Sequence, residues 1–271
     1  MRGDSSWPIP ASERVSFLYL EHVRLERDGN MLVATSGDGV VPIPIGRTNA
    51  VLLGPGTSMT HAAADVCARE GALVQWVGEQ GVRLYASSNP RSNAEALLRQ
   101  ASIRLDPRKR LKAARAIWTR MFSQEPASNR SIDQLRGEEG AKVREWLPKI
   151  AAECGVAWHR RDGNSTDPVN RAINIATSTL YGLAECVTLA LGYSPAIGMI
   201  HSGDPRSFVF DIADTVKFRT VVPLAMRAVA KGAQPLEIGV RRACRDLFYE
   251  SGMANEMVNC VKEVLDAADR A

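Results

Sequence analysis

The sequence predicts an α+β protein, in which a small N-terminal mostly-β domain precedes a C-terminal all-α helical domain. Three observations predict this division. Residues 15–86 consist of short β-prone segments separated by turn residues. Residues 89–93, Asn-Pro-Arg-Ser-Asn, have the composition of a linker. After the linker nearly every segment has helical periodicity, so we expect domains at residues 1–88 and 94–271.

The first domain contains turn signals that separate its strands. Asp-Gly-Asn at 28–30 and Gly-Asp-Gly at 37–39 predict hairpin turns, because glycine adopts positive φ without penalty. Pro42 and Pro44 predict an edge strand, since proline cannot donate to a neighbouring strand. The expected strands are residues 15–20, 23–26, 31–35, 40–45, 51–53, 73–77 and 82–86.

Helices are expected once within the β domain and throughout the second domain. Thr60 is a capping residue for a helix at 61–69. The segments between 208 and 229 have continuous helical composition and are expected to form one helix. The complete set after the linker is 94–103, 107–122, 131–153, 169–191, 208–229, 239–251 and 255–268.

The composition excludes several classes of protein. The chain has 271 residues, 45% hydrophobic and 24% charged, which excludes a disordered or collagenous chain. Its five cysteines are scattered without a CxxC pair, so neither a thiolate zinc site nor a disulfide framework is indicated. The first ten residues lack the apolar run of a signal peptide. The most apolar stretch, 173–200, is broken by polar residues and is not a membrane span, so we expect a cytoplasmic protein without a membrane partner.

The charge is unevenly distributed along the chain. The net charge is only +4, but residues 91–120 hold nine basic residues against Glu95 and Asp106, a local balance of +7. Such a stretch is either a solvated helix face or a track for DNA phosphates, and the composition does not decide between them.

A carboxylate interrupts the apolar face of the helix expected at 131–153. Ser131 and Gln134 form a capping box that fixes the start and the phase of this helix. Glu139 then occupies a position on the apolar stripe, where an unpaired carboxylate would cost several kcal/mol to bury. It therefore needs a hydrogen-bond network or a cation, and the cation is either Arg136 or another arginine in a buried ion pair, or a bound ion. The stripe consists of Ile132, Leu135, Val143, Trp146, Leu147 and Ile150.

A second polar cluster lies between residues 201 and 214. His201 follows an apolar turn, and Asp211 and Asp214 share one face of the next helix. The two aspartates either complement the positive helix N-terminus or hold a cation between them. With Glu139, they make a plausible oxygen-and-imidazole site for Mg²⁺ or Mn²⁺, which supports phosphoryl transfer.

Ordered sequence blocks extend over nearly the whole chain. The blocks of the first half are Arg14-Val15-Ser16, Pro55-Gly56-Thr57, His61-Ala62-Ala63 and the segment 76–87. The blocks of the second half are Gln134-Leu135-Arg136-Gly137-x-Glu139-Gly140, Ser178-x-Leu180-Tyr181-Gly182, Gly192-Tyr193-x-Pro195-Ala196-Ile197-Gly198 and the segment 208–214. Taken together, these blocks resemble the CRISPR adaptation integrases, specifically their subtype I-E branch.

The resemblance implies an activity, a metal site and DNA contacts. It implies a metal-dependent endonuclease and integrase that joins the 3′-hydroxyl ends of captured DNA to the CRISPR repeat beside the leader, and that also cuts branched DNA. Glu139, His201 and Asp214 fall on the family's metal ligands, and Asp211 falls on an adjacent supporting carboxylate that we group with the catalytic residues. The positions that match phosphate-contacting arginines are Arg83, Arg136 and Arg241. Lys217, one turn beyond Asp214, is a further candidate for a phosphate contact, and Tyr181 is expected to face the same pocket or to pack in the core.

The resemblance also implies partners, and it exposes departures. Members form homodimers, and two dimers flank a dimer of a second, small adaptation protein with a ferredoxin-like fold. His22 stands where members can present an aromatic residue that braces a duplex end, and Ser58 and Asp65 stand where a basic residue would favour DNA. A Pro-rich tail that some members dock on the small partner has no counterpart here, so docking would use the helix at 255–268 or another surface.

Two other functions compete with the integrase interpretation. A DNA-carrying scaffold without catalysis would make the acidic cluster structural, although a scaffold has no need of Glu139 on an apolar stripe. An isoprenoid-type synthase built on the DxxD pair lacks a second acidic motif and leaves the β domain unexplained.

Overall fold

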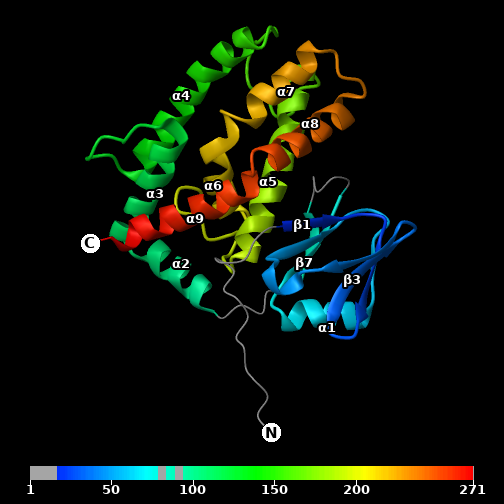
Figure 1. The fold of residues 1–271 in the computed structure, drawn as a ribbon. Coiled ribbons are helices and arrows are strands. Elements are labelled where there is room, and N and C mark those ends of the chain that lie inside the picture. The colour runs from blue at the N-terminus through cyan, green and yellow to red at the C-terminus, as the bar shows by residue number, and fades with distance from the viewer. Residues whose placement is uncertain (1–16, 79–83, 89–93, 271) are drawn as a thin grey trace.

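The computed structural model describes residues 17–78, 84–88 and 94–270, and it has a β part followed by a helical part (Figure 1). Residues 79–83 and the expected linker at 89–93 lie outside the described residues. The predicted α+β class with strands first and helices second is confirmed.

The strands of the β part form two four-stranded sheets. The first sheet has the order β1 (Phe17–Leu20), β5 (Ala50–Leu53), β7 (Leu73–Val77) and β8 (Leu84–Ser87). The second has the order β4 (Gly39–Ile43), β3 (Met31–Ser36), β2 (Arg24–Asp28) and β6 (Ser58–Met59). In the first sheet β1, β5 and β7 are parallel, while β8 runs antiparallel to β7.

The turn signals of the sequence have the predicted effect. Gly29 adopts a φ of +58° between the antiparallel strands β2 and β3. The proline-containing β4 lies at the edge of its sheet, as expected. The two-residue β6 was not predicted, because it is too short to have a pattern of its own and pairs with β2 only through the tertiary fold. Helix α1 (His61–Arg69) begins at Thr60, whose hydroxyl accepts a hydrogen bond from the backbone N–H of Ala63.

The helical part has the long helix α5 (Pro168–Ala190) at its centre, and the four helices that follow it in the chain pack against it (Figure 1). Local caps set several of its boundaries: Asp106 caps α3, Ser131 and Gln134 form the predicted capping box of α4, and Asp167 caps α5. The helices are α2 (Glu95–Leu105), α3 (Pro107–Phe122), α4 (Ile132–Glu153), α5 (Pro168–Ala190), α6 (Ser207–Lys217), α7 (Val221–Ala230), α8 (Leu236–Glu250) and α9 (Met253–Asp269).

The expectation of one helix over 208–229 is wrong, because the chain turns between α6 and α7. Pro223 has no N–H to donate to the carbonyl of Arg219, and its ring would clash with that carbonyl in a continuous helix. The structure places Pro223 in the first turn of α7, where a missing donor costs little. The carbonyl of Val216 accepts bonds from the N–H groups of Arg219 and Thr220 and closes the turn.

Helix α5 joins the two parts of the molecule. Cys186 near its C-terminal end packs with Leu52 and Val77 of the first sheet, and Ala190 packs with Ala50 and Leu73. The middle of the helix lies in the core of the helical part, where Leu180 is fully buried. Among the described residues, no helix is both long and apolar enough to cross a membrane.

Candidate active site

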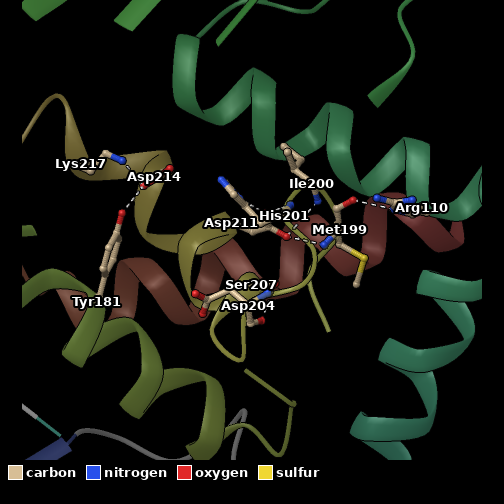
Figure 2. Close-up of polar contacts among 10 residues, drawn as sticks. All are labelled: Arg110, Tyr181, Met199, Ile200, His201, Asp204, Ser207, Asp211, Asp214 and Lys217. Carbon is tan, nitrogen blue, oxygen red and sulfur yellow. Dashed lines mark hydrogen bonds and ion pairs between the residues drawn. The ribbon is translucent and has the colours of Figure 1, made fainter. Parts of the chain in front are cut away.

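The loop Met199–His201, which precedes α6, is held by Asp211 (Figure 2). The carboxylate of Asp211 is fully buried and accepts hydrogen bonds from the backbone N–H groups of Met199, Ile200 at 3.1 Å and His201 at 3.0 Å. It also contacts Nδ1 of His201 at 2.8 Å. Both oxygens are therefore used in fixing the loop, so Asp211 is a positioning residue that sets the place of His201.

His201 is oriented by this contact with one ring nitrogen left available. With Nδ1 facing Asp211, Nε2 is the nitrogen that can ligate a metal ion or contact substrate. Burial lowers the pKa of His201, but the hydrogen bond to Asp211 and the charges of Asp211 and Asp214 outweigh it, so the pKa lies above its usual range. A ring held in this way by a carboxylate is typical of metal-ligating histidines.

Asp214 lies one turn beyond Asp211 on α6 and faces different neighbours (Figure 2). Nζ of Lys217 lies 2.5 Å from Oδ1 of Asp214, and the hydroxyl of Tyr181 lies 3.5 Å from the same oxygen. Burial lowers the pKa of Lys217, but the charge of Asp214 raises it more, so the amine is charged. Burial and the Asp214 charge raise the pKa of Tyr181 to about 12. The side chain of Lys217 therefore neutralises Asp214, and its predicted phosphate contact requires it to leave this ion pair.

Glu139 comes to the same site from α4. Burial and the charge of Asp214 raise the pKa of Glu139, while His201 and Lys217 act in the opposite direction. Glu139, His201 and Asp214 thus influence one another electrostatically although they come from three segments of the chain. In the described part of the chain, Glu139 forms no ion pair with Arg136 or another cation. The neighbouring Glu138 does pair with Arg130, which shows how differently adjacent carboxylates are placed.

The donor set has the chemistry of a metal site, but its side chains are not gathered into one. Carboxylate oxygens and an imidazole nitrogen suit Mg²⁺ and Mn²⁺. The half-buried Glu139 has no partner cation among the described residues. Burial and repulsion from Asp214 raise its pKa, and a cation between the two carboxylates would relieve the repulsion. Among the described residues, no three His, Cys, Asp or Glu side chains lie close enough to form a ready-made metal site. The predicted ligand set stays a prediction that these residues fit.

The arginines expected to contact DNA have different surroundings. Arg136 on α4 is exposed and forms no ion pair with a described residue. Arg241 on α8 pairs with Glu237 one turn earlier. Arg83 lies outside the described residues.

Arg110 of α3 is a residue of this site that the sequence reasoning missed. Its Nε donates a hydrogen bond of 2.8 Å to the carbonyl of Met199, so the His201 loop is held from a second side (Figure 2). Burial and the charge of Arg104 lower the pKa of Arg110. The signal lay in the basic stretch at 91–120, but nothing in that stretch distinguishes Arg110 from its neighbours.

Most of that basic stretch is used within the molecule. Arg99 binds Asp266 and Asp269, and Lys109 also binds Asp269, all on α9. Of the eight basic residues of the stretch that the structure describes, six contact other protein groups, which leaves Arg104 and Arg108. Those six are Arg99, Lys109, Arg110, Lys112, Arg115 and Arg120. The stretch is therefore mainly a contact surface for α9 and adjoining loops, with few cations left for a DNA track.

The comparisons with known proteins agree with this architecture. A family model described as CRISPR associated protein Cas1 matches residues 17–124 and 118–235. A CRISPR-associated endonuclease Cas1 of Geobacter sulfurreducens is 43% identical over 267 residues, covering 96% of this chain and 87% of the relative. The solved TtCas1–DNA complex aligns with a TM-score of 0.84 and 35% identity, covering 95% of this chain and 97% of that chain. A casposase bound to integration product aligns with a TM-score of 0.61 at 13% identity, covering 94% of this chain and 95% of that one, which shows a shared fold.

Proposed function

This chain belongs to the CRISPR-associated Cas1 family, and from that premise we propose that it is a metal-dependent DNA endonuclease and integrase of CRISPR adaptation. It joins the 3′-hydroxyl ends of captured DNA to the strands of the CRISPR repeat by transesterification. One phosphodiester bond replaces another in this reaction, so neither ATP nor a covalent enzyme intermediate is required. The name endonuclease carried by its relatives supports the nuclease part of the proposal.

The observation that carries the proposal is the half-buried carboxylate of Glu139, which has no partner cation among the described residues. Glu139, His201 and Asp214 come from α4, from the loop before α6 and from α6 itself, and each affects the protonation of another. A scaffold that only carries DNA would gain nothing from a half-buried carboxylate without a partner cation among the described residues. Phosphoryl transfer does use such a carboxylate, because a divalent metal ion that the carboxylate would hold supplies the missing positive charge.

The residues of the candidate site have different roles in the proposed reaction. Asp211 and Arg110 hold the His201 loop from two sides and so keep Nε2 of His201 directed to the site. Glu139, His201 and Asp214 would hold Mg²⁺ or Mn²⁺. Either ion, when bound, supplies a Lewis acid that eases deprotonation of the attacking hydroxyl and stabilises negative charge on the phosphate. Lys217 lies one turn beyond Asp214 on α6. Once its amine leaves the ion pair with Asp214, Lys217 contributes positive charge to a phosphate at the site.

The partners follow from the family and from one feature of the surface. We propose a homodimer that assembles with a dimer of a small ferredoxin-like adaptation protein, acts on double-stranded and branched DNA in the cytoplasm, and belongs to the subtype I-E branch. Three side chains of the β3–β4 hairpin region are more than half exposed although they are apolar, which supports a protein contact there. They are Met31 at 52%, Val40 at 59% and Val41 at 60%.

Substitution of Glu139 tests the proposal against the scaffold alternative. We expect Glu139→Ala to abolish joining of a DNA fragment to a repeat substrate, with the partner protein and Mn²⁺ or Mg²⁺ present, while DNA binding persists. Glu138→Ala is the matched control, because Glu138 is the adjacent carboxylate and pairs with Arg130. Joining by Glu139→Ala at the rate of the control would refute the catalytic function and favour the scaffold.

A further inference from the structure

Gln100, on α2, is a buried polar residue that none of the steps above uses. Its side chain is fully buried, and its amide makes three hydrogen bonds to one backbone turn at residues 194–197. Nε2 donates to the carbonyl of Ser194 at 3.0 Å and to the carbonyl of Ile197 at 2.9 Å. Oε1 accepts a bond of 2.8 Å from the N–H of Ser194. Both donors of the amide are therefore used, together with its oxygen.

The three bonds join the two ends of this turn. Pro195 stands second in the turn, at a position that proline favours. The backbone bond of the turn, from the N–H of Ile197 to the carbonyl of Ser194, is long at 3.4 Å, so the side chain of Gln100 is the shorter link between its ends. The carbonyl of Pro195 accepts a bond of 2.8 Å from the N–H of Phe208 in α6. The turn is thus fixed between α2 and α6.

The turn leads directly into the loop that carries His201. Only Gly198 separates Ile197 from Met199, the first residue of that loop. Gly198 is buried, and a Cβ atom at this position would lie 2.5 Å from the carbonyl oxygen of His201 and 2.8 Å from Cβ of Ser207. The backbone at Gly198 therefore already packs against the far end of the loop. A displacement of Ile197 would displace His201 with it, because the chain between them has no free space.

Gln100 acts at a different point of the chain from the other residues that hold this loop. Asp211 on α6 accepts bonds from the backbone N–H groups of the loop, and Arg110 on α3 donates to the carbonyl of Met199. Both residues contact the loop itself. Gln100 contacts the turn before it, which sets the position and direction in which the chain enters the loop. Without Gln100 the bonds to Asp211 and Arg110 would have to fix the loop alone.

The contacts of the turn require a glutamine at position 100. The turn presents two carbonyls and one N–H to the same side chain, which calls for two donors and one acceptor on one group. A glutamate would place an oxygen against the two carbonyl oxygens, and an asparagine is one methylene shorter. An apolar side chain would leave buried carbonyls without a donor, which costs free energy. The amide therefore does more than fill space in the core.

We propose that Gln100 is a positioning residue for His201, and that it holds the turn at 194–197 so that the loop at 199–201 presents its histidine to the candidate active site. Among the described residues, Gln100 makes no hydrogen bond to His201, Asp211 or Asp214, so its effect on the site passes through the backbone. The assignment rests on the proposed function for the reaction that His201 serves.

Hydrogen exchange resolved at single amides tests the proposal without catalysis. Gln100→Met removes the three bonds and nearly keeps the volume of the side chain. Gln75→Met is the matched control, since Gln75 is also fully buried but its side-chain amide has no hydrogen-bond partner among the described residues. In Gln100→Met we expect the N–H groups of Ile200 and His201 to exchange about tenfold faster, although Gln100 bonds to neither. Amides around Leu180 in α5 should exchange at the original rate, and Gln75→Met should leave the loop unchanged.

A DNA joining assay measures the consequence for the site. With the partner protein and Mn²⁺ present, Gln100→Met should lower the joining rate at saturating DNA by about tenfold and leave the KM for DNA unchanged, while Gln75→Met should change neither. A purely structural role would instead reduce the amount of folded protein and accelerate exchange at all amides. If Gln100→Met does not fold, Gln100→Asn replaces it with the same expectation, because its shorter side chain keeps the amide but not the reach.

Three results would overturn the proposal. They are unchanged exchange at Ile200 and His201, equal acceleration at all amides including those of α5, and an unchanged joining rate despite faster exchange in the loop. The exchange measurement also separates this proposal from the proposed function. If the loop exchanges faster as expected but the unaltered protein joins no DNA, the proposed function fails and the contact that holds the loop stands. If the unaltered protein joins DNA and exchange does not change, the reverse holds.

Discussion

Replacing Asp211 with asparagine tests whether this carboxylate is the positioning residue that the structure indicates. The carboxylate accepts hydrogen bonds from three backbone N–H groups and contacts Nδ1 of His201. An asparagine of nearly the same shape keeps one oxygen and replaces the other with an NH₂ group. That NH₂ group would face N–H donors, so at least two of the four contacts are lost.

The expected loss of stability is large because the site is fully buried. A hydrogen bond to a charged acceptor contributes about 1.5–3 kcal/mol, so two of them amount to about 3–6 kcal/mol. For a chain of this size each kcal/mol changes the melting temperature by about 2–4 °C, which predicts a decrease of about 6–24 °C. Joining activity should fall by about 10- to 100-fold, because the orientation of His201 is no longer fixed.

Thermal melting and a DNA joining assay measure the two effects. Asp204→Asn is the control, since Asp204 is a half-exposed carboxylate whose side chain accepts one bond from the N–H of Arg206. It should change stability by less than about 1 kcal/mol. The reasoning is refuted if Asp211→Asn melts and joins DNA like Asp204→Asn.

Three further predictions concern residues around the site and on the surface. Tyr181→Phe should reduce joining by less than about tenfold and leave its pH profile unchanged, because a hydroxyl with a pKa of about 12 is neutral at pH 7; a displaced profile in rate measurements would contradict this. Asp167→Ala should lower the free energy of unfolding by about 1 kcal/mol at pH 7, since it removes the cap of α5. Burial raises the pKa of Asp167, but its hydrogen bonds from Asn170 lower it below 3.8, so this contribution is present above that value and disappears as the pH falls through the lowered pKa. Urea unfolding at neutral and acidic pH measures this effect. A difference in free energy of unfolding between Asp167→Ala and the unaltered protein that stays constant with pH would contradict the assignment to the cap. Arg99→Gln should leave DNA affinity unchanged because Arg99 binds carboxylates of α9, whereas Arg136→Gln should reduce the salt slope by about one; equal effects in binding titrations would refute the distinction.

Local signals in the sequence predict the helix boundaries well where a side chain caps the backbone. Thr60, Ser131 and Gln134 make the hydrogen bonds that their spacing implies, and the helices begin beside them. The break between α6 and α7 had a signal in Pro223, but proline alone does not decide the outcome. Pro148 lies inside α4 without ending it, at an exposed position where water can reach the freed carbonyl.

The sequence predicts a set of site residues, but it does not predict which protein groups each of them contacts. Spacing puts Asp211 and Asp214 on one helix face, which suggests a shared cation. In the structure the backbone N–H groups of the loop at 199–201 bind Asp211 fully, while Asp214 faces Lys217. That loop conformation is a tertiary property. The partners of the basic stretch are equally remote, since Arg99 and Asp266 are 167 residues apart.

The two attachments of α5 limit where related chains can carry insertions or deletions. Its C-terminal end packs on the sheet through Cys186, and its first turns hold Arg161 of the preceding loop through Asn170 and Asn174. Each residue inserted between these points would rotate one end against the other by about 100° and displace it by about 1.5 Å. Related chains should therefore keep the number of residues between Asn174 and Cys186 constant, while the exposed loop positions around Asn164 tolerate insertions and deletions.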